Sequence, residues 1–287
     1  MNDETYFQRI EAIARPGDLR ITRVSVIGAG SGGSQVALEL GRLGVNVLVI
    51  DRQGELLEPH NIVRHVLPAT SLGKPKTTEL AAHIRAYYSA ANIEVADLDV
   101  VRDKEQLTAR LAAFDPHVIA SALDAEEPKH VVNEIALRLG KPVVSGAVYD
   151  GGIGGEVCIT RPNKACYACI AHELKIERGV PASSAIDIDY GTGEHRARSA
   201  SALNLDITQI ATIQTRVILA MLLGQGAEVT GIPDEANVIV FGNRPVPGVV
   251  ARPLHAEFFS IARNPSCLSC NHTPEAVAAA AEILAKL

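Results

Sequence analysis

Three glycines near the N-terminus, Gly28, Gly30 and Gly33, form a G-x-G-x-x-G pattern between an apolar segment and a helical one. Such a turn lets backbone N–H groups and the positive end of the helix approach a phosphate without a Cβ in the way. Asp51 ends the next apolar segment, where a carboxylate can accept hydrogen bonds from ribose hydroxyls. The pattern predicts a nucleotide site, although the glycines could serve only a tight turn with close helix packing, and Asp51 could be a helix cap.

Polar and basic side chains follow in an irregular, proline-containing segment and at the start of the next predicted helix: Asn61, Arg64, Lys74 and Lys76. They would lie on the side of the sheet where phosphates bind. Transfer at an α-phosphate develops charge on the phosphoryl oxygens, and Lys and Arg side chains stabilise that charge. This favours ATP over NAD, because a dinucleotide needs few such donors. Each side chain taken alone could also be a solvated surface charge.

Asp124 ends a further apolar segment, at the carboxyl edge where open α/β sheets bind their ligands. A carboxylate there can hold Mg²⁺, which commonly takes one or two protein carboxylates together with substrate phosphates. Asp124 could instead cap the next helix, since Asp is a preferred N-cap residue. The residues by themselves leave both roles open.

Four of the five cysteines fall into two C-x-x-C pairs, Cys166 with Cys169 and Cys267 with Cys270. Four thiolates suit a tetrahedral structural Zn²⁺, which would fasten the C-terminal segment to the middle of the chain. A thioredoxin-like redox role is the alternative, but neither pair follows the first strand of a thioredoxin-like unit. Cys158 is left over in an apolar strand, which favours a buried thiol over a nucleophile.

The elements that would position these residues alternate between strand and helix. Strands are predicted at 23–28, 46–51, 93–98, 117–123 and 142–148, with helices at 34–43, 76–88, 104–111 and 129–139. After Asp150 the pattern becomes antiparallel, with a buried helix at 204–223, strands near 237–241 and 255–261, and a final helix after Thr273. The sequence predicts an α/β fold: a Rossmann-like sheet, parallel in its N-terminal half, with antiparallel strands in its C-terminal half and helices on both faces.

Length predicts one domain over residues 1–287. We expect a nucleotide-binding half at about 20–150 and a substrate and zinc half at 151–287, which contains a mobile crossover loop at about 171–203. A composition of 47% hydrophobic and 4% aromatic residues suits helices packed on a parallel sheet.

Charge and hydropathy exclude some classes of protein. A net charge of −6 argues against a general nucleic-acid binder. No stretch approaches the roughly 18 to 20 uninterrupted apolar residues of a membrane helix, and the N-terminus lacks the apolar core of a signal peptide. We therefore expect a cytoplasmic protein.

Taken together, the motifs resemble the E1-like ThiF/MoeB/HesA superfamily over most of the chain. The resemblance is carried by GAGSGG, Asp51, Asn61-Ile-Val-Arg64, Gly73-Lys-Pro-Lys76, Asp124 before a helix, PVVSGAVYDGGIGGEV and the two C-x-x-C pairs. It implies adenylation, by MgATP, of the C-terminal glycine of a ubiquitin-like or sulfur-carrier protein, or of a peptide, with release of pyrophosphate. It further implies that Asp51 binds ribose, that Asn61, Arg64 and Lys76 contact the phosphates, and that Asp124 holds Mg²⁺.

The resemblance also implies a homodimer in which an N-terminal arginine of one subunit reaches the other's ATP. Arg9 is the best match and Arg15 the alternative. The family commonly has an acidic residue two positions after the ribose aspartate, where Gln53 stands here, and the interval from Asp51 to Asn61 is slightly long.

Some relatives pass the activated C-terminus to their own cysteine in the crossover region. Residues 171–203 contain no cysteine, so we expect no internal thioester. An NAD-dependent Rossmann oxidoreductase and a non-catalytic nucleotide-binding scaffold remain as alternative functions.

Overall fold

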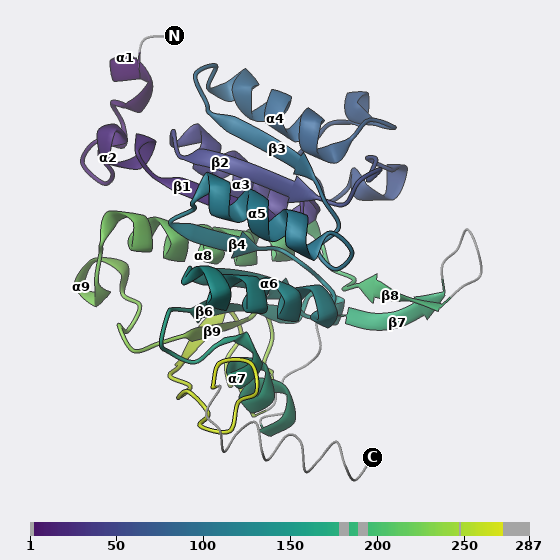
Figure 1. The fold of residues 1–287 in the computed structure, drawn as a ribbon, viewed down its shortest axis with the longest axis vertical. Helices are drawn as coiled ribbons and strands as arrows, with labels where there is room; N and C mark the ends of the chain where they lie inside the picture. Colours follow the sequence, from purple (N-terminus) through teal and green to yellow (C-terminus); the bar gives the residue numbers. More distant parts are fainter. Residues whose placement is uncertain (1–2, 178–183, 189–194, 247, 272–287) are drawn as a thin grey trace.

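The structure is a computed structural model that describes residues 3–177, 184–188, 195–246 and 248–271. In that part of the chain, an eight-stranded sheet carries helices on both faces, and a two-stranded ribbon projects beyond it (Figure 1). Part of the predicted crossover loop and the predicted helix after Thr273 lie outside the described residues.

The N-terminal half of the sheet is parallel, in the order β3-β2-β1-β4-β5. Its strands are β1 (Arg23–Ile27), β2 (Asn46–Asp51), β3 (Ile93–Asp97), β4 (Val118–Ser121) and β5 (Val143–Val148). The chain builds outward from β1 in one direction and returns to build from β4 in the other, so strand order reverses between β1 and β4. The carboxyl ends of these two strands therefore open a crevice, the usual ligand site of such sheets.

The C-terminal half continues the same sheet with antiparallel strands, as predicted. They are β6 (Gly154–Thr160), β9 (Val238–Gly242) and β10 (His255–Phe259), in the order β5-β6-β9-β10. Every residue of β6 is buried, which suits a strand covered on both faces.

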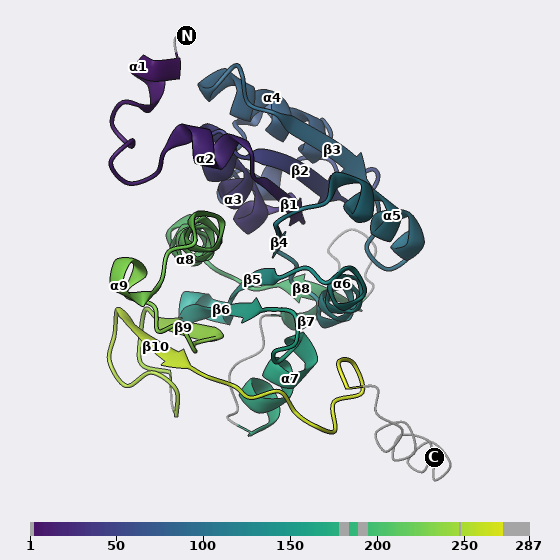
Figure 2. The ribbon, with the colours of Figure 1, turned by 60° about the vertical axis from the view of Figure 1, so that its left-hand side comes forward.

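Helices cover both faces of the sheet, as predicted (Figure 2). One face carries α3 (Ser31–Arg42), α4 (Lys76–Tyr87) and α8 (Asn204–Leu223), and the other carries α5 (Lys104–Phe114) and α6 (Glu126–Leu139). Apolar side chains at helical spacing face the sheet, for example Val36, Ala37 and Leu40 of α3, which are all fully buried.

Shorter elements complete the described chain. They are α1 (Asp3–Phe7), α2 (Pro16–Arg20), α7 (Tyr167–Ala171), a π-helical turn (His172–Glu177), α9 (Ala227–Thr230) and three 3₁₀ turns, Pro59–Asn61, Ala69–Ser71 and Asp150–Gly152. The two N-terminal helices were not predicted. Their anchor is aromatic, because Phe7 packs edge-on against Tyr88 at the end of α4, with ring centroids 5.3 Å apart.

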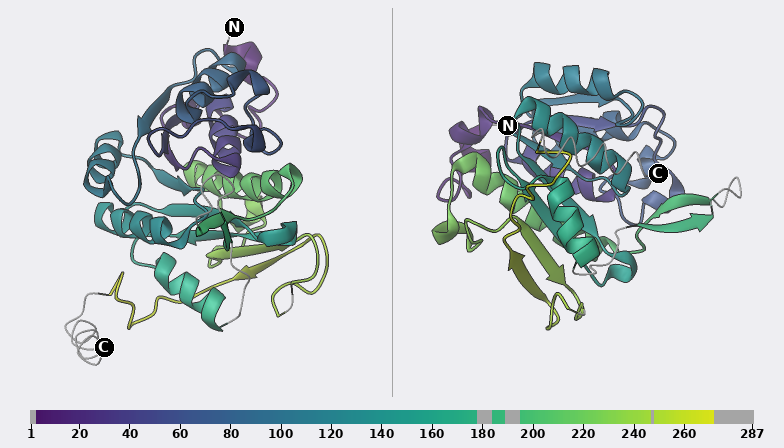
Figure 3. Two further views of the ribbon diagram at one scale, coloured as in Figure 1. Left: turned by 90° about the vertical axis from the view of Figure 1, so that its right-hand side faces the viewer. Right: turned by 60° about the horizontal axis from the view of Figure 1, so that its bottom comes forward.

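The prediction that the whole crossover is a loop was wrong. Ser184–Ile188 (β7) pairs with His195–Ser199 (β8) in an antiparallel ribbon that stands off the main sheet (Figure 3). These two strands were not predicted because their sequences are rich in polar and small residues, and the alternating apolar pattern typical of a strand is weak there.

Among the described helices, α8 alone is long and apolar enough to cross a membrane by length and composition, with a mean hydropathy of 1.2 over its best window. Here it lies on the sheet against β5 and β6, and 44% of that window is buried inside the protein.

Candidate functional site

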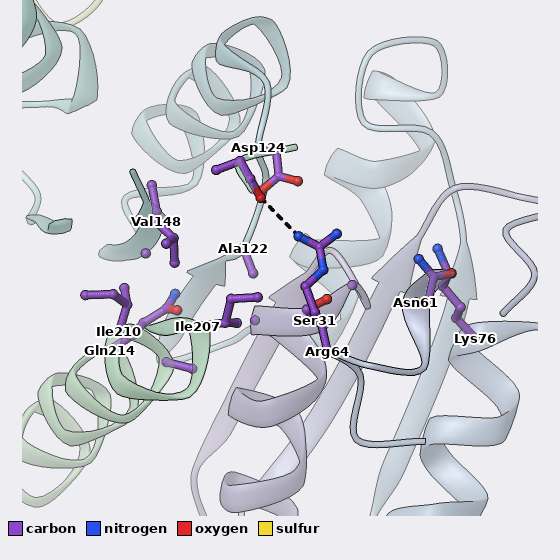
Figure 4. A pocket seen from close by; sticks show the side chains of 16 residues that line it. Ser31, Asn61, Arg64, Lys76, Ala122, Asp124, Val148, Ile207, Ile210 and Gln214 are labelled. Carbon is purple, nitrogen blue, oxygen red and sulfur yellow. Dashed lines mark hydrogen bonds between the residues drawn. The ribbon is translucent and has the colours of Figure 1, made fainter. Parts of the chain in front are cut away.

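A pocket opens at the carboxyl edge of the sheet, beside the reversal between β1 and β4 (Figure 4). One wall is polar, and the other is apolar with both small and β-branched side chains. The polar wall consists of Gly30, Ser31, Gly32, Asn61, Arg64, Lys76 and Asp124, and the apolar wall includes Gly146, Ala147, Val148, Ala200, Ile207, Ile210 and Ala211. The structure thus brings four of the predicted polar side chains, those of Asn61, Arg64, Lys76 and Asp124, into one cavity with Gly30 of the glycine turn.

The three motif glycines have different physical reasons for being glycine. A Cβ on Gly28, whose φ is +96°, would lie 2.6 Å from the carbonyl oxygen of Ala122, and a Cβ on Gly33 would lie 1.8 Å from that of Gly28. These two glycines let the turn, α3 and the end of β4 meet at backbone distance. Gly30 differs, because a Cβ there would meet no protein atom within 4 Å and its φ of −72° suits any residue. Gly30 lines the pocket, so the absence of a side chain there leaves space for a ligand.

Asp51 lies at the end of β2 and holds the glycine turn. Its Oδ2 accepts the backbone N–H of Ala29 at 3.1 Å, and its Oδ1 accepts that of Arg52 at 2.9 Å. Burial raises the pKa of Asp51 above its ordinary value, while the two N–H donors and the charge of Lys76 oppose that rise. Asp51 borders the turn and is not among the side chains that line the cavity itself.

Lys76 and Asn61 are both fixed by contacts within their loop. The Nζ of Lys76 lies 2.8 Å from Oε2 of Glu55, and only 11% of the Lys76 side chain is exposed. Asn61 accepts the backbone N–H of Glu58 through Oδ1 at 3.0 Å. The acidic side chain beside Lys76 is therefore Glu55, two residues beyond Gln53, within the long interval that follows Asp51.

Arg64 and Asp124 point toward one another across the pocket (Figure 4). Arg64 donates through Nη1 to the carbonyl oxygen of Ala200 at 3.0 Å, so it also fastens the returning end of the crossover. Desolvation by the surrounding protein raises the pKa of Asp124, and attraction from Lys129 and Arg64 opposes that rise. The N-cap position of α6 is occupied by Ala125, so Asp124 stands one residue before it and lines the pocket.

Two predicted basic residues lie away from this pocket. Lys74 pairs with Glu79 at 3.4 Å on the surface. Arg9 is exposed in the N-terminal segment, which packs at the amino ends of the strands, opposite the pocket (Figure 1). Arg9 does not line the pocket of its own chain.

Two site residues escaped the sequence reasoning, and both are buried polar side chains. His65 bonds the carbonyl oxygen of Ala29 through Nε2 at 2.8 Å, and its Nδ1 accepts the N–H of Leu67 at 3.1 Å. This network assigns the proton to Nε2, and burial lowers the pKa of His65, so the ring is neutral. His65 therefore anchors the glycine turn from within the loop.

Gln214 of α8 is the second missed residue. Its Nε2 donates to the carbonyl oxygens of Ser121 at 3.1 Å and Val144 at 2.9 Å, so it ties α8 to the end of β4 and the first part of β5. A glutamine inside an apolar helix was the available signal, because such a residue needs buried partners.

The four paired cysteines form one cluster at the other end of the molecule. Their sulfur atoms all lie within 4.8 Å of one another, with close approaches of 3.6, 3.7 and 3.9 Å. Four sulfurs at the Zn–S bond length of about 2.3 Å would stand about 3.8 Å apart, whereas a disulfide needs about 2.05 Å. The N–H of Asn264 donates to Cys169 at 3.4 Å, a contact typical of a metal-bound thiolate. The cluster fits a structural zinc ion.

Cys158 stands apart as a thiol buried in β6. Burial raises its pKa well above the ordinary value, and the charge of Glu156 adds to the rise. It therefore lacks the thiolate character of a nucleophile.

A sequence model of the ThiF family matches residues 8–251. The adenylyltransferase and sulfurtransferase MOCS3 of Arabidopsis thaliana is 30% identical over 162 residues, which cover 55% of this chain and 33% of that protein. The sulfur carrier protein adenylyltransferase of Thermus thermophilus is 24% identical over 274 residues, which cover 90% of this chain and 86% of that protein. The chain spans about a third of the length of the first curated relatives that it matches.

Solved structures show the same fold. E. coli MccB with ATP aligns over 94% of this chain and 75% of that chain, with a TM-score of 0.67 and 15% sequence identity. E. coli MccB in complex with N-formylated MccA aligns over the same share of this chain with a TM-score of 0.68 and 16% identity. At these identities the likeness concerns the fold alone.

Replacement of Gly30 tests whether the space above the turn is ligand space. Gly30→Ala should leave the thermal midpoint within a few degrees and weaken ATP binding about 10-fold, because one inserted methyl group costs roughly 1 to 3 kcal/mol in a filled site. Calorimetry of ATP binding measures this. The matched variant Gly33→Ala should instead lower stability, because its Cβ would collide with the Gly28 carbonyl. Unchanged ATP affinity in Gly30→Ala would remove the ligand from this space.

Metal analysis tests the cysteine cluster. Protein purified under reducing conditions should contain about one zinc per chain, and Cys270→Ser should lose it together with several degrees of thermal midpoint, since zinc binding is coupled to folding. Cys158→Ala is the control and should keep the metal. Zinc-free wild-type protein with full stability would contradict the assignment.

Proposed function

The chain belongs to the ThiF family, and from this membership and the pocket we propose that it is an ATP-dependent adenylyltransferase. Its substrate would be the C-terminal carboxylate of a ubiquitin-like or sulfur-carrier protein, or of a peptide. The observation that carries the proposal is that Asp124 and Arg64 face each other over the pocket whose rim is the glycine turn. That arrangement suits a metal-bound triphosphate better than a nicotinamide, whose reduction requires no such pair.

In the proposed reaction, an oxygen of the substrate carboxylate attacks the α-phosphorus of ATP. A bond forms between them, the bond from the α-phosphorus to the bridging oxygen breaks, and pyrophosphate leaves with the electron pair. Because an anion attacks an anion, cationic groups must neutralise both. Arg64 and Lys76 supply positive charge from the polar wall, and Asn61 adds a side-chain amide there.

Asp124 would hold Mg²⁺ together with phosphate oxygens, which fits the small number of protein ligands that Mg²⁺ commonly takes. When bound, the ion would withdraw charge from the phosphates. Asp51 would accept from the ribose hydroxyls beside the turn formed by Gly28, Gly30 and Gly33.

The apolar wall supports a narrow acyl group. Between the larger Ile207, Ile210 and Val148, this wall has a part where Ala147, Ala200 and Ala211 present only a methyl group to the pocket. A chain that ends in glycine is the narrowest acyl substrate that a protein or peptide offers. This wall supports, on steric grounds, the C-terminal glycine that the family resemblance implies.

We infer release of the acyl-adenylate to an external acceptor. Cys158 is buried, the other four cysteines form the metal cluster, and the crossover contains none. A thioester on this chain would need an accessible thiolate near the pocket.

We further propose a cytoplasmic homodimer that binds neither nucleic acid nor membrane. The exposed Arg9 lies at the edge of the sheet opposite its own pocket, so it cannot contact an ATP bound in its own chain. This geometry supports its predicted role toward the partner's ATP.

Exchange of radioactive pyrophosphate into ATP, with candidate proteins or peptides ending in glycine, tests the proposal. Wild type should catalyse the exchange, and Asp124→Asn should lower its rate at least about 100-fold, as expected for loss of a group that stabilises charge in the transition state. Asp115→Asn is the matched control at the other end of β4, where a φ of 50° suits Asn.

The outcomes separate the three functions. Tight NAD(H) binding without exchange would favour the oxidoreductase. ATP binding without exchange, for every candidate substrate, would favour the scaffold.

A further inference from the structure

Glu126, the first residue of α6, receives three hydrogen bonds and lies two residues after Asp124. Its Oε1 accepts from Lys129 at 3.0 Å and also from Lys175, and its Oε2 accepts from the hydroxyl of Tyr167 at 2.9 Å. Both carboxylate oxygens are therefore engaged. The proposed chemistry assigns no role to this residue.

Two of the three donors belong to the segment that carries half of the cysteine cluster. Tyr167 lies between Cys166 and Cys169 at the start of α7, and its backbone N–H donates to Oδ1 of Asn133 on α6 at 2.8 Å. Lys175 follows in the π-helical turn and also donates to the Tyr167 hydroxyl at 3.4 Å. Helix α6 is thus bonded at Glu126 and at Asn133 to the segment that carries Cys166 and Cys169.

These bonds restrain the start of α6, where the N-cap residue makes no side-chain hydrogen bond to the helix. Ala125 occupies the N-cap and has no side chain that can accept from the first helical N–H groups. Glu126 places a fixed negative charge in that first turn, where the helix dipole favours it.

Burial makes the arrangement costly to rearrange. The Lys129 side chain is 3% exposed, and it bonds Glu126 while its charge also attracts Asp124. A buried ammonium cannot lose a carboxylate partner without a large penalty, so Lys129 and Glu126 restrain each other. Lys129 connects this restraint to the pocket.

We propose that Glu126 is a positioning residue for Asp124, which fastens the start of α6 to α7 and thereby couples the zinc cluster to the pocket carboxylate. The inference rests on the proposed function. Loosening this link should displace Asp124 and reduce its grip on Mg²⁺, while the glycine turn and the rest of the ATP contacts stay in place.

Glu126→Gln keeps the size of the side chain and removes its charge. The Mg²⁺ concentration that gives half-maximal pyrophosphate exchange should rise about 10-fold, the magnitude common for residues that orient metal ligands. In calorimetry, Mg²⁺ should strengthen ATP binding less than in wild type, whereas affinity for metal-free ATP and zinc content stay unchanged. Glu134 lies on the same helix as Glu126 and pairs with Lys104 of α5 at 2.6 Å; Glu134→Gln is the control and should behave as wild type.

Tyr167→Phe removes one donor by deleting a single oxygen and keeps the test usable if Glu126→Gln folds poorly. Alone it should raise the Mg²⁺ requirement by a smaller factor, and the double variant should show less than the product of the two effects, because the residues are bonded. Wild-type Mg²⁺ dependence in either variant, or strictly multiplicative effects, would overturn the inference.

Absence of exchange in wild type would sink the proposed function instead. The calorimetric comparison of ATP binding with and without Mg²⁺ would then still decide the role of Glu126.

Discussion

The backbone contact between the glycine turn and the end of β4 is the constraint on which the site depends. Gly28 approaches Ala122 so closely that no side chain fits, and Gly33 presses α3 onto the same turn. This contact lies where the strand order reverses between β1 and β4, the place where open α/β sheets bind their ligands. It sets Asp124, two residues after Ala122, opposite the open rim at Gly30. Turn and carboxylate are therefore one rigid unit.

Buried polar side chains hold that unit in place. Asp51 and His65 bond the N–H and the carbonyl oxygen of Ala29, and Gln214 bonds carbonyl oxygens at the end of β4 and in the first part of β5. Loss of such a bond would lower the stability of the fold, because a buried polar group left unpaired costs roughly 1 to 3 kcal/mol. The turn is thus held by buried hydrogen bonds within the protein itself.

Sequence alone predicted the features that depend on local patterns. The parallel strands are apolar runs that end in polar residues, and the cysteine pairs are recognised by their spacing. The observed strand pairing confirmed the strands, and the sulfur positions confirmed that the four cysteines form one cluster. His65, Gln214 and Glu126 were not foreseen, because their partners lie far away in sequence or are backbone atoms. Asp124 shows the limit most clearly. Its type and position allowed a cap or a ligand, and it took the structure to show Ala125 at the N-cap and Asp124 in the lining of the pocket.

The polar wall is already satisfied within the protein, and this shapes how it can bind. Lys76 is paired with Glu55, and Arg64 donates to the carbonyl oxygen of Ala200. A phosphate that binds Lys76 and Arg64 must therefore compete with Glu55 and with the carbonyl oxygen of Ala200. Such competition lowers affinity for a single phosphate, because the internal bonds must be shared or broken. A triphosphate, which presents several anionic oxygens at once, can offset that cost over several donors. The pairing thus favours triphosphates over smaller anions of the same chemistry.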